Sequence, residues 1–195
     1  MERLLHSTGC VDCSRKAKAL IVRFGSLRNV LTAAPEEIRR ALEGDQNTTN
    51  QLLLLTEAIL WSLKQAVDRR PLFDTQDALL AYLKFTQGFS EVEKVRAMFL
   101  DAGNRLIVEE VISMGQPTEA TIYARELVRR CLELGAVGLI LVHNHPSGNP
   151  LPSQADRVLT VEVRAKARVM GVCLQDHLIV ARDNHYSFRK DGFLP

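Results

Sequence analysis

Two histidines and an aspartate in the C-terminal part of the chain have the residue types and spacing of a metal site. His143 and His145 follow an apolar run, Val137–Val142, whose length and flanking glycine and proline favour an interior strand over a helix. Side chains alternate between the two faces of a strand, so the two imidazoles should point the same way. Pro146 cannot continue a sheet ladder, which places the pair where the strand ends.

The loop after this strand leads to an acidic residue. Its residues, SGNPLP, include one glycine and two prolines and should form a stiff, irregular connection. Ser153 then has the features of a helix N-cap, with Asp156 three residues later. Two imidazoles and one carboxylate would thus gather at the carboxyl end of a central strand, and three such ligands with one open position are typical of catalytic zinc. The same Ser153 and Asp156 also form a simple capping pair, which alone would explain both residues.

The length and composition indicate an ordinary globular protein. The 195 residues allow one medium domain, or a small domain and a larger one, and 46% hydrophobic with 25% charged residues is a common balance. No apolar run approaches the roughly 20 residues of a membrane span. The N-terminus, MERLLHSTG, lacks the apolar core of an export signal, so we expect a cytoplasmic protein with no membrane association.

The charge and the cysteine content exclude few classes of function. Residues 1–70 hold 11 basic and 8 acidic residues, while residues 71–195 hold 14 and 15, so neither part is basic enough to indicate nucleic-acid binding by charge alone. Cys10 and Cys13 form a C-x2-C pair that suits metal or redox chemistry, but no second pair accompanies it. We therefore expect reduced thiols.

Periodicity and turn residues predict two parts. Residues 1–70 should be all helical, with helices over 14–24, 36–43 and 50–68 and with Gly25 and Gly44 as stops. The second part begins at residue 72, and from residue 93 onward strands and helices alternate, which predicts an α/β fold with a mixed sheet between helices. The predicted elements of this part are a helix over 75–85, a hairpin of strands 95–100 and 105–113, a helix capped by Thr118 or Thr121 and running to Leu134, the histidine strand, a helix over 153–170, and strands beginning at Cys173 and Tyr186. In the helix that ends at Leu134, we expect Leu132 to face inward.

The spacing H-x-H-P-x6-S-x2-D resembles the JAMM motif of JAB/MPN metal-dependent hydrolases, and its five positions are filled by His143, His145, Pro146, Ser153 and Asp156. The surrounding words resemble the bacterial RadC branch: FLDAGNRLI (Phe99–Ile107), IYARELVRRCLELGA (Ile122–Ala136), DHLIV (Asp176–Val180) and YSF (Tyr186–Phe188). The resemblance is close over residues 72–195. It implies a JAB/MPN domain there, an α/β sandwich similar to cytidine deaminase, though the zinc signature of the deaminases is absent.

The resemblance also implies a chemistry. Zn²⁺ on His143, His145 and Asp156 would serve a hydrolase of amide or isopeptide bonds in a peptide or protein substrate, in which a glutamate activates a metal-bound water. Matching VRAMFLD to the first strand of the family assigns this glutamate to Glu93, with Glu91 as the alternative. The hydroxyl of Ser153 would help to hold the oxyanion.

Glu109, Glu110 and His177 are polar residues that lie outside this motif. Glu109 and Glu110 have the pattern of ordinary exposed residues. His177 lies in a word typical of RadC proteins and would either contact a metal ligand or substrate, or simply be a polar residue that enters a strand.

The N-terminal part leaves a second class of function open. RadC proteins usually have an N-terminal helix-hairpin-helix segment, which binds the DNA backbone through the backbone amides of glycines. The corresponding segment here, LEGDQNTTNQ, has one glycine and two acids, so we expect weak DNA binding and favour a small helical bundle used for packing or docking. A non-catalytic or accessory role in DNA maintenance remains the alternative to the hydrolase, and the sequence does not indicate an oligomeric state.

Overall fold

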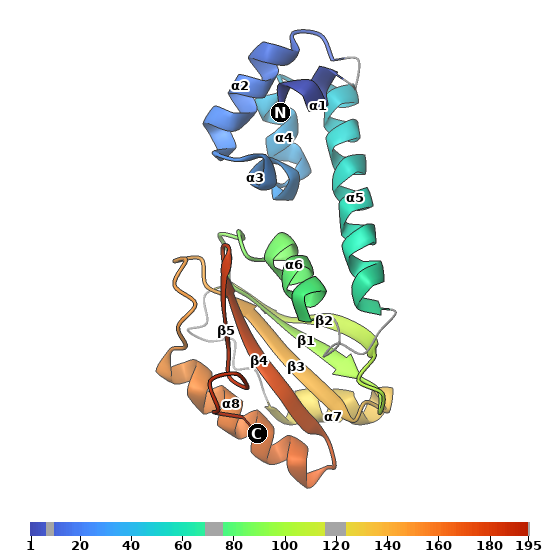
Figure 1. The fold of residues 1–195 in the computed structure, drawn as a ribbon, viewed down its shortest axis with the longest axis vertical. Coiled ribbons are helices and arrows are strands. Elements are labelled where there is room, and N and C mark those ends of the chain that lie inside the picture. The colour runs from blue at the N-terminus through green and yellow to red at the C-terminus, as the bar shows by residue number, and fades with distance from the viewer. Residues whose placement is uncertain (7–9, 69–75, 116–123, 195) are drawn as a thin grey trace. The chain divides into compact units, whose positions relative to one another are not determined.

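The structure is a computed structural model that describes residues 1–6, 10–68, 76–115 and 124–194. The chain divides into two compact units, Met1–Ser62 and Leu63–Pro195 (Figure 1). The helices of the first unit are α1 (Glu2–His6), α2 (Cys13–Phe24), α3 (Leu27–Thr32), α4 (Pro35–Ala41) and most of α5 (Gln46–Asp68). The described residues contain no helix that is both long enough and apolar enough to span a membrane.

In the first unit, glycines follow the helices where the sequence predicts stops, but the predicted start of α5 is wrong. Gly25 follows α2 with φ +79°, Pro35 is the first residue of α4, and Gly44 has φ +84°. Helix α5 begins at Gln46 and not at Asn50. The carboxylate of Asp45 accepts a hydrogen bond from the backbone nitrogen of Thr48 (3.1 Å), so the polar residues before Asn50 form the first turn of the helix.

The connection between α4 and α5 is bound to α2 by two ion pairs. Arg15 contacts Glu43 at 2.6 Å and Lys16 contacts Asp45 at 2.5 Å. The acids of the connection therefore neutralise two basic side chains of the neighbouring helix.

The second unit is built on a five-stranded mixed sheet, which confirms the predicted α/β class. The strand order is β2-β1-β3-β4-β5, and β3 and β4 are parallel while the other pairs are antiparallel. The strands are β1 (Lys94–Leu100), β2 (Leu106–Met114), β3 (Gly138–Asn144), β4 (Cys173–Ala181) and β5 (Asn184–Ser187), and the helices are α6 (Gln76–Thr86), α7 (Ala124–Leu134) and α8 (Gln154–Val169). The central position of β3 explains its continuous apolar sequence.

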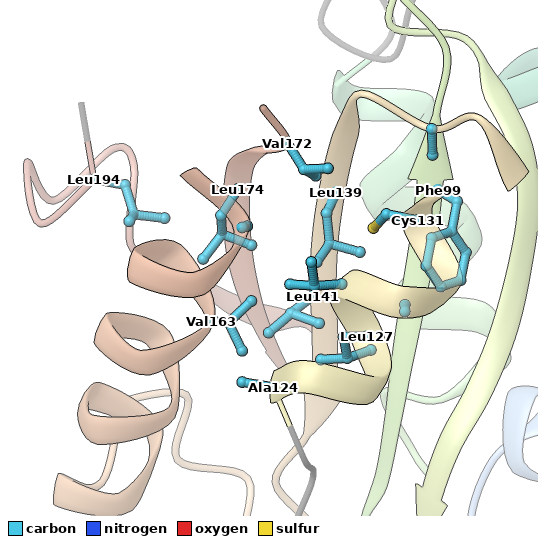
Figure 2. Close-up of a cluster of buried hydrophobic side chains, with 14 of the residues drawn as sticks. Phe99, Ala124, Leu127, Cys131, Leu139, Leu141, Val163, Val172, Leu174 and Leu194 are labelled. Carbon is cyan, nitrogen blue, oxygen red and sulfur yellow. The ribbon is translucent and has the colours of Figure 1, made fainter. Parts of the chain in front are cut away.

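The core lies between the sheet and the two helices α7 and α8 (Figure 2). Phe99 from β1, Leu139 and Leu141 from β3, Leu127 from α7 and Val163 from α8 are all buried there. Because α8 packs against this face, the residues at its start are brought to the carboxyl end of β3.

A β-bulge in β4 changes which side chains reach this core. Leu139 pairs with Leu174, but its neighbour Ile140 pairs with Asp176, so Gln175 is an extra residue on β4. Leu174 and Ile179 both belong to the core although they are five positions apart, an offset that would place them on opposite faces of a regular strand. The bulge therefore places His177, and not Asp176, on the face covered by α8.

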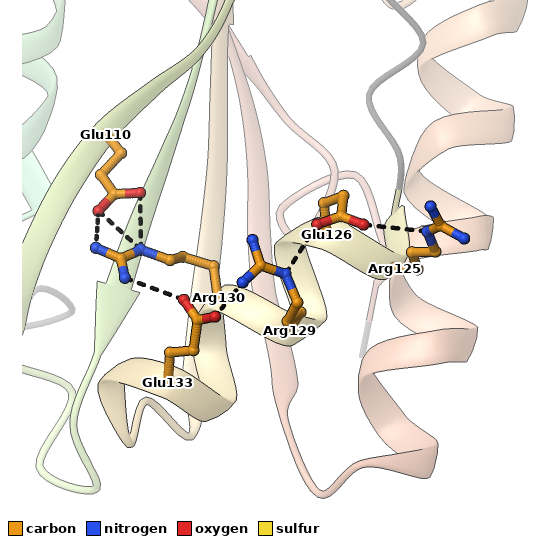
Figure 3. A network of polar contacts seen from close by, with 6 residues as sticks. All are labelled: Glu110, Arg125, Glu126, Arg129, Arg130 and Glu133. Atoms are coloured by element: carbon orange, nitrogen blue, oxygen red, sulfur yellow. Dashed lines mark hydrogen bonds and ion pairs between the residues drawn. The ribbon is translucent and has the colours of Figure 1, made fainter.

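Two expectations about surface positions are wrong. Leu132 is 50% exposed, because the inward stripe of α7 consists of Leu127, Val128 and Cys131. Glu110 is half-buried and accepts hydrogen bonds from Arg130 of α7 in a network of charged residues (Figure 3). Its neighbour Glu109 is likewise half-buried, beside Arg96 and Tyr82.

The hydrogen bond from Arg130 lowers the pKa of Glu110, so this glutamate fastens α7 to β2 rather than facing water. The caps expected at Thr118 or Thr121 lie outside the described residues.

Candidate metal centre

The two histidines meet at the end of β3. His143 is a buried residue of the strand, and His145 follows it, with a backbone nitrogen that donates to the carbonyl of Val180 at 3.0 Å. The Nε2 atoms of the two rings lie 2.9 Å apart. The prediction that both imidazoles point the same way is therefore confirmed.

Asp156 faces the same point from the first turn of α8. Its Oδ1 lies 3.3 Å from Nε2 of His143, and its Oδ2 lies 3.6 Å from Nε2 of His145. The capping interpretation is confirmed as well: Oδ2 accepts hydrogen bonds from the backbone nitrogen of Ser153 (2.7 Å) and from its hydroxyl (2.6 Å), and the Ser153 oxygen accepts from the Asp156 backbone at 3.2 Å. One carboxylate thus caps α8 and faces both histidines.

Glu93 lies beside the histidines, immediately before β1. Its carboxylate and the ring nitrogens of His143 and His145 lie within 4.8 Å of one another. Glu91, the alternative glutamate, is exposed and does not belong to this group. The structure therefore brings together four of the five predicted site residues, namely the two histidines, Asp156 and Glu93. The fifth, Ser153, is hydrogen-bonded to Asp156.

Hydrogen bonds define the protonation of His145. Its Nδ1 lies 2.8 Å from the backbone carbonyl of Asn149. A carbonyl can only accept a hydrogen bond, so Nδ1 carries a proton, and in the neutral ring Nε2 carries a lone pair directed at His143 and Asp156. Two imidazole nitrogens and a carboxylate consequently converge on one point, and such a cluster requires a cation, either a proton or a metal ion.

The electrostatics of the group separate its two carboxylates. Burial raises the pKa of Asp156, but the hydrogen bonds and charges of His145, His143 and Ser153 outweigh it and hold the pKa below the usual range. For Glu93, burial is the largest influence and raises the pKa. Asp156 is thus the stable anion of the site, and Glu93 is the carboxylate that more readily takes a proton.

The histidines differ in the same way. Burial lowers the pKa of His143 to about 4, whereas the hydrogen bond to Asp156 raises the pKa of His145. In the absence of a metal ion, an additional proton would therefore reside on His145.

Two residues at the site were not singled out by the sequence. Asn144 lies between the histidines, is fully buried, and bonds to the segment that precedes β1. Thr160 lies one turn after Asp156 in α8 and contacts His177, whose ring reaches His143. Alternation along a strand gave a signal for Asn144, because the residue between two inward histidines must face the other way. His177 is itself fully buried, and Asp176 binds Ser187 and the backbone of Arg189.

The fold and the site together define an α/β domain of the JAB class, with a histidine and carboxylate cluster at the end of its central strand. Residues 73–193 match the model of the family described as the RadC-like JAB domain, and the chain belongs to this family. It is 37% identical over 183 residues to a UPF0758 protein of Rhodobacter capsulatus, covering 94% of this chain and 86% of the relative. A UPF0758 protein of Ruegeria pomeroyi is 36% identical over 183 residues, which cover 94% of this chain and 82% of that protein.

Proposed function

We propose that this protein is a zinc-dependent hydrolase of amide or isopeptide bonds in peptide or protein substrates, with zinc held by His143, His145 and Asp156. The observation that carries the proposal is the convergence of the two Nε2 atoms, 2.9 Å apart, with the carboxylate of Asp156 at 3.3 and 3.6 Å. Membership of the JAB class supports it.

The donor set fits zinc. Two neutral imidazoles and one carboxylate form a three-ligand site of the kind in which zinc keeps one position for water or substrate. Zinc bound there would lower the pKa of a water molecule and polarise the carbonyl of the substrate. The pKa of His143, about 4, keeps this ring neutral and available as a ligand at neutral pH.

The opposite pKa directions of Asp156 and Glu93 decide their proposed roles. A ligand must remain an anion, which suits Asp156, whose pKa is held low. A general base must accept a proton from water and later donate it to the leaving amine, which suits a carboxylate whose pKa is raised by burial, as in Glu93. Glu93 therefore remains the proposed base, within reach of the histidine pair.

Ser153 has a more constrained role than the motif alone implies. Its hydroxyl proton is donated to Oδ2 of Asp156 at 2.6 Å. To help hold an oxyanion, the hydroxyl would have to turn from Asp156 to the substrate, and Asp156 would keep the bond from the Ser153 backbone nitrogen (2.7 Å).

Metal binding tests the ligand set first. The purified full chain should bind about one zinc ion with high affinity, and His143→Ala should abolish most of this binding. Asp156→Asn is the matched variant for the acid, because it retains an oxygen that can cap α8 while it removes the negative charge. It should fold normally and bind zinc much more weakly. If both variants bind zinc as the unmodified chain does, the ligand assignment is wrong.

A cleavage screen tests the reaction. The zinc-loaded protein would be incubated with a library of peptides and with isopeptide-linked lysine conjugates, and the products would be identified by mass spectrometry. Cleavage that disappears in His143→Ala and in the chelator-treated protein supports the proposal. If zinc binds but no amide or isopeptide bond is cut, the hydrolase proposal fails while the metal site stands.

A further inference from the structure

A buried chain of polar side chains lies behind His143, on the side away from His145. Nδ1 of His143 lies 2.9 Å from Nε2 of His177, and Nδ1 of His177 lies 2.7 Å from the hydroxyl of Thr160. That hydroxyl lies 2.5 Å from the backbone carbonyl of Asp156. Both His177 and Thr160 are 0% exposed, so these contacts are shielded from bulk solvent.

The contact between the Thr160 hydroxyl and the Asp156 carbonyl fixes the direction of every hydrogen bond in this series. The carbonyl of Asp156 can only accept, so the Thr160 hydroxyl donates to it and accepts from His177. Nδ1 of His177 must then carry a proton, which leaves its Nε2 as an acceptor. Nδ1 of His143 is consequently the donor to His177, and Nε2 of His143 carries the lone pair.

The surroundings of His177 hold its ring in place. The ring is fully buried, and such a position favours the neutral form of an imidazole. The ring of Phe188 stacks on that of His177, with centroids 4.8 Å apart and planes 9° apart. His177 reaches this face of the sheet only because of the bulge at Gln175 in β4.

We propose that Thr160 and His177 are positioning residues that hold His143 as the Nδ1-protonated tautomer, with the lone pair of Nε2 directed at the metal position. This inference rests on the proposed zinc site. The carbonyl that accepts the hydrogen bond from Thr160 belongs to Asp156. One proposed ligand residue, Asp156, thus selects the tautomer of another, His143, through Thr160 and His177. A metal-binding histidine commonly donates its second N–H to such a partner, and loss of the partner weakens metal binding about 10- to 100-fold.

Nitrogen NMR of the full chain without metal gives the first test. At a pH above the titration of His145, the ¹⁵N shifts and couplings of His143 and His177 should show a protonated Nδ1 and an unprotonated Nε2 in each ring. A protonated Nε2 on His143 would overturn the inference. This measurement needs neither a variant nor zinc, so it decides the tautomer of His143 separately from the zinc proposal.

Zinc affinity, measured by competition with a chelator, gives the second test. Thr160→Val has nearly the same shape but no hydroxyl, and it should weaken zinc binding about 10-fold, while Thr160→Ser should restore it. His177→Phe retains a ring that can stack on Phe188 and should weaken binding about 10- to 100-fold.

Thr49→Val is the matched control. Thr49 is buried and donates its hydroxyl to the carbonyl of Asp45, four residues earlier, as Thr160 does to Asp156, but it lies in the first unit. It should leave zinc affinity unchanged. If Thr160→Val binds zinc as tightly as the unmodified chain does, the positioning role is excluded although the zinc site remains.

Discussion

Oδ1 of Asn144 accepts a hydrogen bond at 2.9 Å from the backbone nitrogen of Lys94, the residue that follows Glu93. The amide nitrogen of Asn144 donates to the carbonyls of Val92 (3.1 Å) and Ser90 (3.3 Å). One buried side chain thus binds the backbone on both sides of Glu93. The residue between the two histidines therefore sets where the proposed base lies relative to them.

Asn144→Ala should loosen the segment that carries Glu93. The Ser90 carbonyl and the Lys94 N–H would lose this partner in a partly buried place, while the Val92 carbonyl would keep its hydrogen bond from the Ser90 hydroxyl. The loss should cost about 1–3 kcal/mol of unfolding free energy. Hydrolysis should fall while zinc content is retained. Denaturant unfolding and metal analysis would measure both effects, with the exposed Asn184→Ala as control. Unchanged stability would show that these bonds do not hold the segment.

Glu93→Gln should remove hydrolysis without disturbing the fold. Glutamine has the shape of glutamate but cannot accept the proton, and loss of a general base lowers kcat about 10²–10⁴-fold. Because burial disfavours the Glu93 anion, the neutral variant should melt at the same temperature or slightly higher. Glu91→Gln is the control and should behave as the unmodified chain. Full activity of Glu93→Gln would transfer the base to another residue.

Ser153→Ala should separate the capping role of this serine from its proposed catalytic role. Loss of the N-cap of α8 should lower the unfolding free energy by about 1 kcal/mol, and zinc binding should persist because all three ligands remain. If the hydroxyl also holds the oxyanion, kcat should fall about 10²–10³-fold. Ser153→Thr, which retains a capping hydroxyl, should recover stability. An activity of Ser153→Ala equal to that of the unmodified chain would leave only the cap.

Asp45 should give the first unit a defined dependence on pH. The hydrogen bonds from Lys16 and Thr48 lower the pKa of Asp45 to about 2. This value lies below that of the unfolded chain, about 3.9, so the contribution is complete above about pH 4 and is lost as the pH falls through about 2. Asp45→Asn should therefore be less stable at about pH 6, and the difference should shrink by about pH 3.

The fluorescence of Trp61, the single tryptophan of the chain, can follow the denaturant unfolding of this unit. A difference between the two proteins that is independent of pH would contradict the role of the charge.

DNA binding by the full chain should be weak and sensitive to salt. Arg15 and Lys16 are paired with Glu43 and Asp45, so fewer cations are available for phosphate. We expect a dissociation constant for duplex DNA in the range of nonspecific binding, about 10⁻⁴–10⁻⁶ M, that rises steeply with salt. The double variant Glu43→Gln with Asp45→Asn should bind more tightly. Tight, salt-resistant binding by the unmodified chain, measured by fluorescence anisotropy, would favour the DNA-maintenance function.

The parts that the sequence predicted are those governed by local rules. The apolar run before His143, the stop at Gly25 and the cap at Ser153 each depend on a few adjacent residues, and their spacing predicted the histidine strand and the start of α8. The start of α5 was missed because Asp45 caps it through a side-chain bond that an apolar pattern does not reveal. The exposure of Leu132 depends on how α7 lies on the sheet, which no local pattern determines.

The contact between His143 and His177 was beyond such rules for another reason. It joins residues 34 positions apart and depends on the register between two parallel strands. A sequence pattern gives the alternation within β4 but not the extra residue, Gln175, that changes its phase.

The bulge at Gln175 makes the count of residues in β4 as significant as their identity. A regular strand that kept all these residues would place Leu174 and Ile179, which are five positions apart, on opposite faces of the sheet. If Leu174 kept its place in such a strand, the carboxylate of Asp176 would replace the imidazole of His177 behind His143. Deletion of Gln175, by contrast, would remove the bulge and leave Leu174, His177 and Ile179 on one face, so the bulge is what lets a strand with one extra residue keep His177 behind His143.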